Sequence, residues 1–285
     1  MYALKMMPSC RTNIYITTPF LMKYVIANAT GGTIKHLNQS ILVDFPIPIT
    51  EKHEQDKIAK LLDSLESIIT LHQRKLEKLQ ATKKALLYEL FPIENSRRPK
   101  RRFKGFTDDW EQRKLGDVVK RESVTQVSST EYPAIEYEDV IPETGQLNKD
   151  IYKKGVQKAG ILFDANKVLY GKLRPYLHNW VAPMYKGVAV GDWWVLNPCG
   201  LDRGFLYTLI QTVKFDTIAN QSTGSKMPRA DWKLLSTTEF SIPSLDEQIK
   251  IGKLVEGLND YITLHQRKLE KLKNLKAAYL NEMFV

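Results

Sequence analysis

Hydrophobic residues recur with a seven-residue period in two separate segments of this chain. In each segment the apolar positions step alternately by four and three residues, from residue 58 to 90 and again from residue 251 to 283. This spacing places them on one stripe of a helix and is typical of a coiled-coil seam. No proline interrupts either run, and Gln, Arg, Lys and Glu, which favour helices, fill the positions between. The pattern predicts two long helices of about 35 residues, each roughly 50 Å long at ~1.5 Å per residue.

The two segments are copies of one sequence. Residues 69–79 and residues 262–272 both read ITLHQRKLEKL, and the two copies begin 193 positions apart (262 − 69). The similarity extends outward, so that residues 20–91 are a diverged copy of residues 205–284, whereas residues 105–205 have no earlier counterpart. Such a duplication predicts a module with pseudo-twofold symmetry, in which the first copy lacks its N-terminal part.

Two helices of this kind in one chain are most simply explained as a pair packed on each other. The connection of about 100 residues or more allows an antiparallel pair, and the alternative is that each helix docks on its own globular domain. His72 and His265 occupy equivalent seam positions near the middle of each helix, where a twofold axis brings them together. A metal site needs three or four ligands, so we expect a buried polar pair that fixes the helix register instead. The seam lysines, Lys83 and Lys276, lie near the helix ends, where long side chains reach water.

The segment between the long helices predicts a mixed α/β domain over residues 106–243. Residues 108–119 (DDWEQRKLGDVV) have helical propensity, with an aspartate as candidate cap. Residues 132–200 are rich in Tyr, Val, Ile and Trp between turn signals and predict several short strands. Residues 204–220 have helical spacing, and residues 239–243 predict a strand that leads into the second long helix.

Charge adds a candidate partner to this picture. The chain has 42 Lys and Arg against 32 Asp and Glu, a formal net charge of +10, which favours an anionic partner and nucleic acid first. Residues 96–104 (SRRPKRRFK) hold six basic residues and no acid, and they read either as a solvated linker or as a connector that contacts phosphates. Cys10 and Cys199 are too few for a disulfide framework. With no secretory signal and no apolar run of ~20 residues, we expect a cytoplasmic protein that does not enter membranes.

Two loops in the mixed domain carry side chains suited to double-stranded DNA. Arg and Asn make bidentate contacts with base edges, Tyr can stack or hold a phosphate, and a glycine lets the backbone approach a phosphate that Lys and Arg neutralise. Each loop also reads as an ordinary charged surface loop. The candidate DNA-binding residues in the two loops, 167–180 and 220–229, are Lys172, Arg174, Tyr176, Asn179, Gly224, Lys226 and Arg229.

Catalytic motifs are absent from the sequence. It contains no phosphate-binding loop, no dinucleotide-binding glycine pattern, no nucleophile elbow and no amino-methyltransferase motif. We therefore expect a non-catalytic protein with no cofactor and no metal.

Several stretches resemble one family. The segment beginning WEQRKLGDVV, the segment STGSKMPRADWKLL with its following EQIKI, and the repeated ITLHQRKLEKL helix resemble the specificity (S) subunit of type I restriction–modification systems. The resemblance implies a DNA-recognition subunit with two target-recognition domains, each followed by a long helix, and the two helices forming an antiparallel coiled coil. It also implies a bipartite DNA target, two methyltransferase (M) subunits and motor-nuclease (R) subunits as partners.

The predicted fold class is thus a mixed α/β target-recognition domain plus a long antiparallel two-helix coiled coil. The departure from the family pattern is the shortened first domain, which a separately encoded N-terminal S fragment could complete. An alternative function is a truncated or split subunit that binds M subunits as an assembly or inhibitory fragment, with little sequence-specific DNA binding. The predicted parts are a first-domain remnant (1–50), the first long helix (51–92), a basic linker (93–105), the second target-recognition domain (106–243) and the second long helix (244–285).

Overall fold

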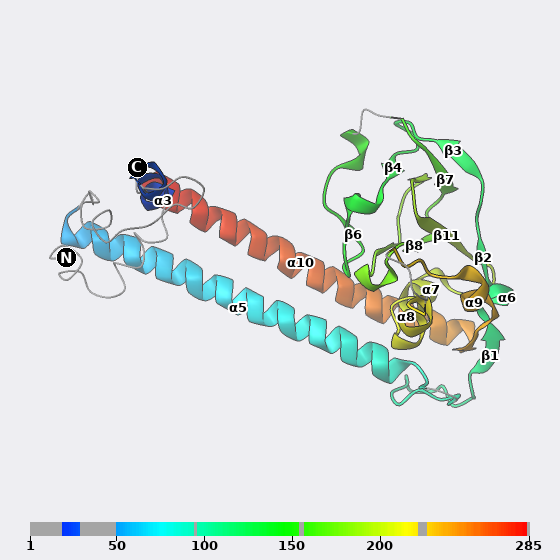
Figure 1. Ribbon diagram of the computed structural model, residues 1–285. Coiled ribbons are helices and arrows are strands. Elements are labelled where there is room, and N and C mark those ends of the chain that lie inside the picture. Colours follow the sequence, from blue (N-terminus) through cyan, green and yellow to red (C-terminus); the bar gives the residue numbers. More distant parts are fainter. Residues whose placement is uncertain (1–18, 29–49, 94–95, 154–156, 222–226, 284–285) are drawn as a thin grey trace. The chain divides into compact units, whose positions relative to one another are not determined.

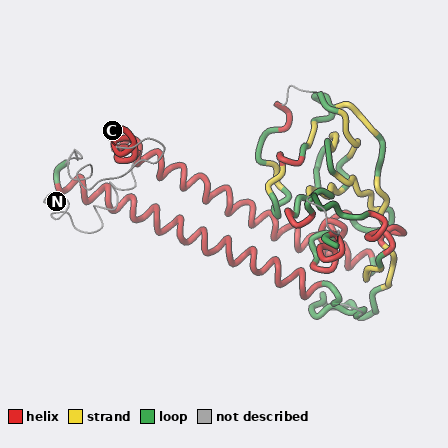
Figure 2. Tube along the Cα trace, viewed as in Figure 1, coloured by secondary structure: helices red, strands yellow, loops and turns green. Residues whose placement is uncertain are grey.

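The chain forms two compact units, and the division passes through both long helices. One unit contains Met1–Lys78 with Leu264–Val285, and the other contains Leu79–Thr263. Figures 1 and 2 show their helices and strands. The computed structural model describes residues 19–28, 50–93, 96–153, 157–221 and 227–283.

The two long helices predicted from the heptad pattern are present. They are α5 (Lys52–Leu90) and α10 (Leu245–Met283), each of 39 residues. Every seam position in both helices is buried or half-buried, so the 4–3 stepping located the packed face correctly. The other helices and turns of the described residues are α3 (Pro19–Asn28), α6 (Leu115–Val118), α7 (Arg203–Leu209), α8 (Val213–Ala219), α9 (Trp232–Thr237), η1 (Tyr137–Asp139), η2 (Ile151–Lys153) and η3 (Pro175–Leu177).

In the unit that contains Met1–Lys78 and Leu264–Val285, α5 and α10 run antiparallel. Leu62 and Leu280 form the centre of a small buried cluster, which Ile58 and Met283 flank. Lys276 Nζ lies 2.5 Å from a carboxylate oxygen of Glu66. Early residues of α5 therefore meet late residues of α10, as Figure 1 shows.

The unit Leu79–Thr263 is built on short strands in four small sheets. Their orders are β3-β7-β10-β4, β2-β11-β8-β9, β1-β12 and β5-β6, and among these described pairings only β10 with β4 is parallel. The strands are β1 (Glu111–Lys114), β2 (Val119–Arg121), β3 (Thr125–Val127), β4 (Ala134–Ile135), β5 (Val140–Ile141), β6 (Gln146–Leu147), β7 (Ala159–Phe163), β8 (Val168–Gly171), β9 (Trp180–Val181), β10 (Gly187–Ala189), β11 (Trp193–Pro198) and β12 (Glu239–Ile242).

Strand β11 lies between two hydrophobic cores of this unit. Trp194 and Leu196 belong to the core that packs against α7 and α8, whereas Trp193 and Val195 belong to a second core on the opposite face. Successive side chains of a strand point to opposite faces, so the adjacent tryptophans anchor different cores. The four are at most 2 % exposed.

One prediction of local structure was wrong. The helix expected over residues 108–119 is instead β1, one turn of helix and β2. Strand β1 pairs antiparallel with β12, and Gln112 Nε2 donates to Ser241 Oγ at 2.7 Å, so a partner distant in sequence overrides local helical propensity. The helical spacing of residues 204–220 is confirmed, and it is divided into α7 and α8 because Thr212 caps the start of α8.

Candidate nucleic-acid interface

The structure joins the two loops that carry the predicted DNA contacts. The backbone N–H of Ala230 donates to the carbonyl of Lys172 at 2.8 Å, and the N–H of Arg174 donates to the carbonyl of Pro228 at 2.7 Å. These bonds surround an isolated antiparallel bridge between the loops. Residues more than fifty positions apart in sequence therefore form one surface.

Asp192 gathers two of the predicted cations on this surface. Its carboxylate accepts from Arg229 Nε at 3.3 Å and from Arg229 Nη2 at 3.2 Å, and it lies 3.6 Å from Lys172 Nζ. The side chain of Arg229 is 53 % exposed, so it remains reachable from solvent. The hydrogen bond with Asp192 raises the pKa of Arg229 above its ordinary value. Sequence reasoning missed Asp192 because an acid is not itself a phosphate ligand.

Tyr176 stands at the tip of η3, between two residues with left-handed backbone. Its side chain is 52 % exposed, while Arg174 has φ 47° and His178 has φ 55°. Glu143, in the turn between β5 and β6, has φ 64°, and these three are the non-glycine residues with positive φ in the described part of the chain. Such conformations cost energy and persist only where surrounding contacts hold them.

The ring of His178 supplies such contacts. Its Nδ1 lies 3.1 Å from Glu143 Oε1 and its Nε2 lies 2.9 Å from Asp216 Oδ1, while Trp180 stacks on the ring with centroids 5.3 Å apart. The N–H of Glu143 also donates to the carbonyl of His178 at 3.0 Å. The sequence placed His178 in the candidate loop, but nothing in the sequence indicated its two carboxylate partners.

Two predicted contacts are less accessible than expected. Asn179 is only 4 % exposed and hydrogen-bonds the side chain of Tyr137, whose hydroxyl donates to the carbonyl of Leu173. Burial raises the pKa of Tyr137 to about 12. Asn179 therefore packs beneath the loop in this structure, and Arg174 Nε is buried as well.

The remaining two predicted contacts, Gly224 and Lys226, lie outside the described residues.

The basic linker is held by acids of the same chain. Arg102 makes a bidentate pair with Glu247 at 2.8 and 2.9 Å, and Glu247 is only 1 % exposed. This hydrogen bond raises the pKa of Arg102. Two further arginines of the linker also pair with carboxylates: Arg98 with Asp109, and Arg101 with Glu89 at 2.6 Å. These contacts give the linker a structural role beside the start of α10.

The structure brings together the two seam histidines. Nδ1 of His72 lies 3.0 Å from Nδ1 of His265, and His265 is 6 % exposed. Desolvation, with the nearby charges of Lys75, His72 and Lys268, lowers the pKa of His265. Within the described residues no group of three or more His, Cys, Asp or Glu side chains could hold a metal ion. The role of His72 and His265 in fixing the helix register stays a prediction.

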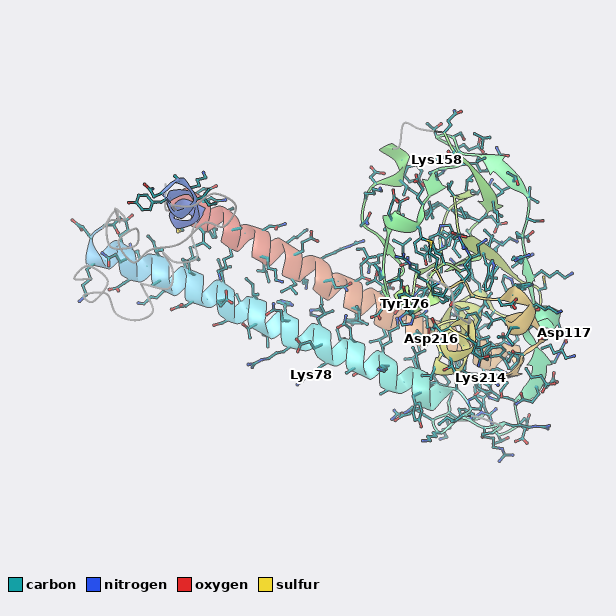
Figure 3. All side chains as sticks on the ribbon, in the orientation of Figure 1. Lys78, Asp117, Lys158, Tyr176, Lys214 and Asp216 are labelled. Carbon is teal, nitrogen blue, oxygen red and sulfur yellow. The ribbon has the colours of Figure 1, made fainter. Side chains whose placement is uncertain are left out.

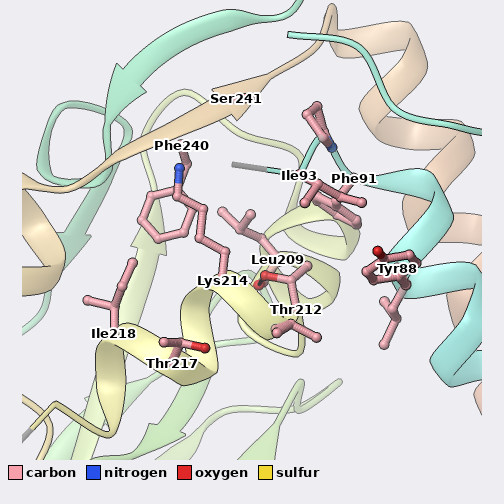
Figure 4. Close-up of a pocket in the computed structure, with 13 residues that line it drawn as sticks. Tyr88, Phe91, Ile93, Leu209, Thr212, Lys214, Thr217, Ile218, Phe240 and Ser241 are labelled. Atoms are coloured by element: carbon pink, nitrogen blue, oxygen red, sulfur yellow. Dashed lines mark hydrogen bonds between the residues drawn. The ribbon is translucent and has the colours of Figure 1, made fainter. Parts of the chain in front are cut away.

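An apolar pocket of about 360 Å³ lies in the unit Leu79–Thr263, beside the end of α5 (Figure 4). Tyr88 of α5, Phe91 directly after it, Leu209, and Phe240 of β12 contribute to its wall. Lys214 Nζ lies 5.2 Å from the centroid of the Phe240 ring and donates to the carbonyl of Glu239 at 2.7 Å. No acid, histidine or cysteine is among the residues that line this pocket.

Comparison with known proteins identifies the family. Residues 9–81 and 107–274 match the model of the type I restriction modification DNA specificity domain. This match covers most of the chain, which therefore belongs to that family. None of the helices in the described ranges has the length and apolar character needed to span a membrane.

Named relatives and solved structures agree with this assignment. The chain is 24 % identical to the type I restriction enzyme MjaVIII specificity subunit of Methanocaldococcus jannaschii, covering 92 % of this chain and 66 % of that protein. It is also 24 % identical to the EcoDI specificity subunit of Escherichia coli, covering 95 % and 70 %.

The fold is similar to that of the S subunit from M. genitalium, with TM-score 0.59, 17 % identity, and 93 % and 72 % of the two chains covered. It is similar to the HsdS subunit of Thermoanaerobacter tengcongensis, with TM-score 0.51, 16 % identity, and 96 % and 69 % covered. The chain thus spans about two thirds of the length of these relatives.

Proposed function

We propose that this chain is a sequence-specific DNA-recognition subunit of a type I restriction–modification complex, and that residues 106–243 read one half of a bipartite target. The observation that carries the proposal is the joined surface that holds exposed Tyr176, exposed Arg229 and half-buried Lys172. The chain's family supplies the class of function, and this surface supplies the groups that would meet DNA. We propose that the complex works in the cytoplasm.

Asp192 suggests how the surface would meet a duplex. In the free chain its carboxylate balances Arg229 and Lys172, so both cations are oriented before DNA arrives. A phosphate approaching the exposed guanidinium would replace the carboxylate as its partner, while Tyr176 projects from η3 toward the bases.

Salt-dependent binding tests this surface. We expect R229A and K172A to weaken binding of the complex with its M subunits to all duplexes, because each removes a phosphate contact. Each variant should lower the slope of log affinity against log salt by about 1. Fluorescence anisotropy over a salt series measures this slope. R113A is the matched control, since Arg113 is an exposed cation of the separate β1–β12 sheet. A slope unchanged in R229A and K172A would contradict the proposed surface.

A repeated apolar pattern supports the scaffold role. Three large hydrophobic side chains at equivalent positions are exposed in each long helix, between 38 % and 66 %. They lie off the buried seam, so the helix pair leaves them uncovered. We propose that each copy docks one M subunit, and that R subunits join the assembled complex. The equivalent pairs are Leu61 and Leu254, Ile68 and Tyr261, and Leu71 and Leu264.

Matching local bonds support the pseudo-twofold duplication. Gln55 Nε2 donates to the carbonyl of Thr50 at 2.6 Å, and its counterpart Gln248 donates to the carbonyl of Pro243 at 2.9 Å. A copy of residues 105–205 is not found earlier in this sequence. We therefore propose that the reader of the second half-site lies outside these 285 residues, for example in a separately encoded fragment.

A further inference from the structure

We infer that His178, held between Glu143 and Asp216, is a proton-dependent positioning residue for the η3 turn on the DNA-facing surface. These three residues are called the His178 clamp below. The inference deepens the proposed function and rests on it for its DNA consequence, but the clamp itself is testable without DNA.

Both ring nitrogens of His178 face carboxylates. The distances are 3.1 Å from Nδ1 to Glu143 and 2.9 Å from Nε2 to Asp216. An ionised carboxylate only accepts hydrogen bonds, so both bonds form together only when the imidazole carries two protons. The neutral ring keeps one N–H and turns the lone pair of its other nitrogen toward a carboxylate. Protonation therefore decides whether the clamp closes on two sides or on one.

The clamp connects three elements that are far apart in the sequence. Glu143 belongs to the β5–β6 turn, His178 ends η3, and Asp216 belongs to α8. Asp216 is fixed further by Asn220 Nδ2, which donates to its carboxylate at 2.8 Å. In Figure 3 the labels Tyr176 and Asp216 mark η3 and α8, the two elements that the contact between His178 and Asp216 connects. The contact of His178 with Asp216 thus ties η3 to α8 only two positions after exposed Tyr176.

Backbone conformation gives an independent reason to assign a positioning role here. Both Glu143 and His178 have positive φ, and Arg174 on the other side of η3 does too. Left-handed backbone at non-glycine residues relaxes when its supporting bonds are removed. Opening one side of the clamp would therefore allow η3 to leave the conformation that presents Tyr176.

Two titratable side chains of other elements, Lys83 and Tyr170, lie near the carboxylates of the clamp. Lys83 of α5 interacts with Glu143, and burial lowers the pKa of Lys83 to about 8. Tyr170 of β8 is influenced by Asp216, and burial raises its pKa well above neutrality. Trp180 covers one face of the ring without titrating. Histidine is the side-chain type suited to a proton-dependent contact near neutral pH, and the tests below compare two pH values for this reason.

Hydrogen–deuterium exchange of residues 172–179 tests the clamp in the chain alone. We expect exchange, corrected for the intrinsic effect of pH, to be slower at pH ~5.5 than at pH ~7.5 in the parent chain. H178Q should exchange quickly at both values, and E143Q should show part of the effect. H53Q removes an exposed histidine of α5 and should behave as the parent. Equal protection at both pH values in the parent would overturn the clamp, whatever DNA does.

DNA binding tests the positioning role. For the complex with M subunits, affinity for a cognate duplex relative to a scrambled duplex should fall about tenfold from pH ~5.5 to ~7.5, the size of one charge-assisted hydrogen bond. H178Q should show a low, pH-independent ratio, and K83M should keep the pH dependence. If hydrogen exchange depends on pH but the ratio of cognate to scrambled affinity does not, the positioning role is overturned and the clamp itself stands. If the complex with the parent chain prefers no duplex, the proposed function is overturned. The hydrogen-exchange experiment on the chain alone then still decides whether the clamp exists.

Discussion

At the scale of single residues, an unusual contact joins His72 and His265 in the mainly apolar seam of the long helices. Two polar rings 3.0 Å apart at their Nδ1 atoms need one ring to donate and the other to accept. A neutral pair meets this need, whereas two imidazolium rings repel each other beside Lys75 and Lys268. The helix pair should therefore tolerate neutral pH better than acid.

The sign follows from the pKa of His265, which is lowered from its ordinary value of 6.5. The unfolded chain then binds more protons than the folded chain as the pH falls through that range, so stability is lost on acidification. We expect the melting temperature of the unit containing these helix segments to fall between pH ~7 and ~5. Circular dichroism measures this transition.

H72L/H265L should remove the acid sensitivity, because a Leu pair fills the seam without titrating. H53L, which replaces an exposed histidine of α5, should keep it. An acid transition of the same size in H72L/H265L would exclude the histidine pair as its source.

A second residue-scale prediction concerns the buried ion pair of Arg102 and Glu247. R102M leaves a carboxylate that is 1 % exposed without its partner, and such changes cost about 3–5 kcal/mol of unfolding free energy. The exposed pair of Arg101 with Glu89 makes R101M a matched control, expected to cost at most about 1 kcal/mol. Denaturant titration compares the two variants. If R102M loses no more unfolding free energy than the at most about 1 kcal/mol expected of R101M, the contact of Arg102 with Glu247 does not stabilise the start of α10.

At the scale of elements, the sequence located the long helices, the short strands within residues 132–200 and the strand at 239–243, but it missed β1 and β2. The heptad seams depend on residues within one segment, so their period is visible locally. The strand β1 depends on β12, which lies more than 120 residues later in the chain, and no local pattern contains that pairing. The same reason explains the loops: Lys172, Arg174 and Arg229 were found by residue type, while Asp192 and the partners of His178 depend on distant segments.

The exposed apolar positions of α5 and α10 give a prediction at this scale. A glutamate at Leu71 or at Leu264 should weaken binding of one M subunit, because a charge would face an apolar contact. Changing both positions should abolish co-purification with M subunits while the helical signal stays unchanged. A81E, at an exposed position on a different face of α5, is the control. Full M binding by the variant with both changes would place the docking surface elsewhere.

At the scale of the whole molecule, the proposal of a DNA reader rests on family membership together with the joined loop surface. The target sequence does not follow from either, because base choice depends on distances and on DNA shape as well as on residue type. The likeness to solved structures defines the fold, and the chain's own surface defines which side chains to change.

The most direct measurement is the map of methylated adenines in DNA from cells that express this chain with its M subunits. The proposal predicts a recurring motif whose half read by residues 106–243 is relaxed or lost in Y176A and R229A, while R113A leaves it unchanged. Co-purification with M subunits without any motif, or a motif that both variants leave intact, would contradict the assignment of this surface as the DNA reader.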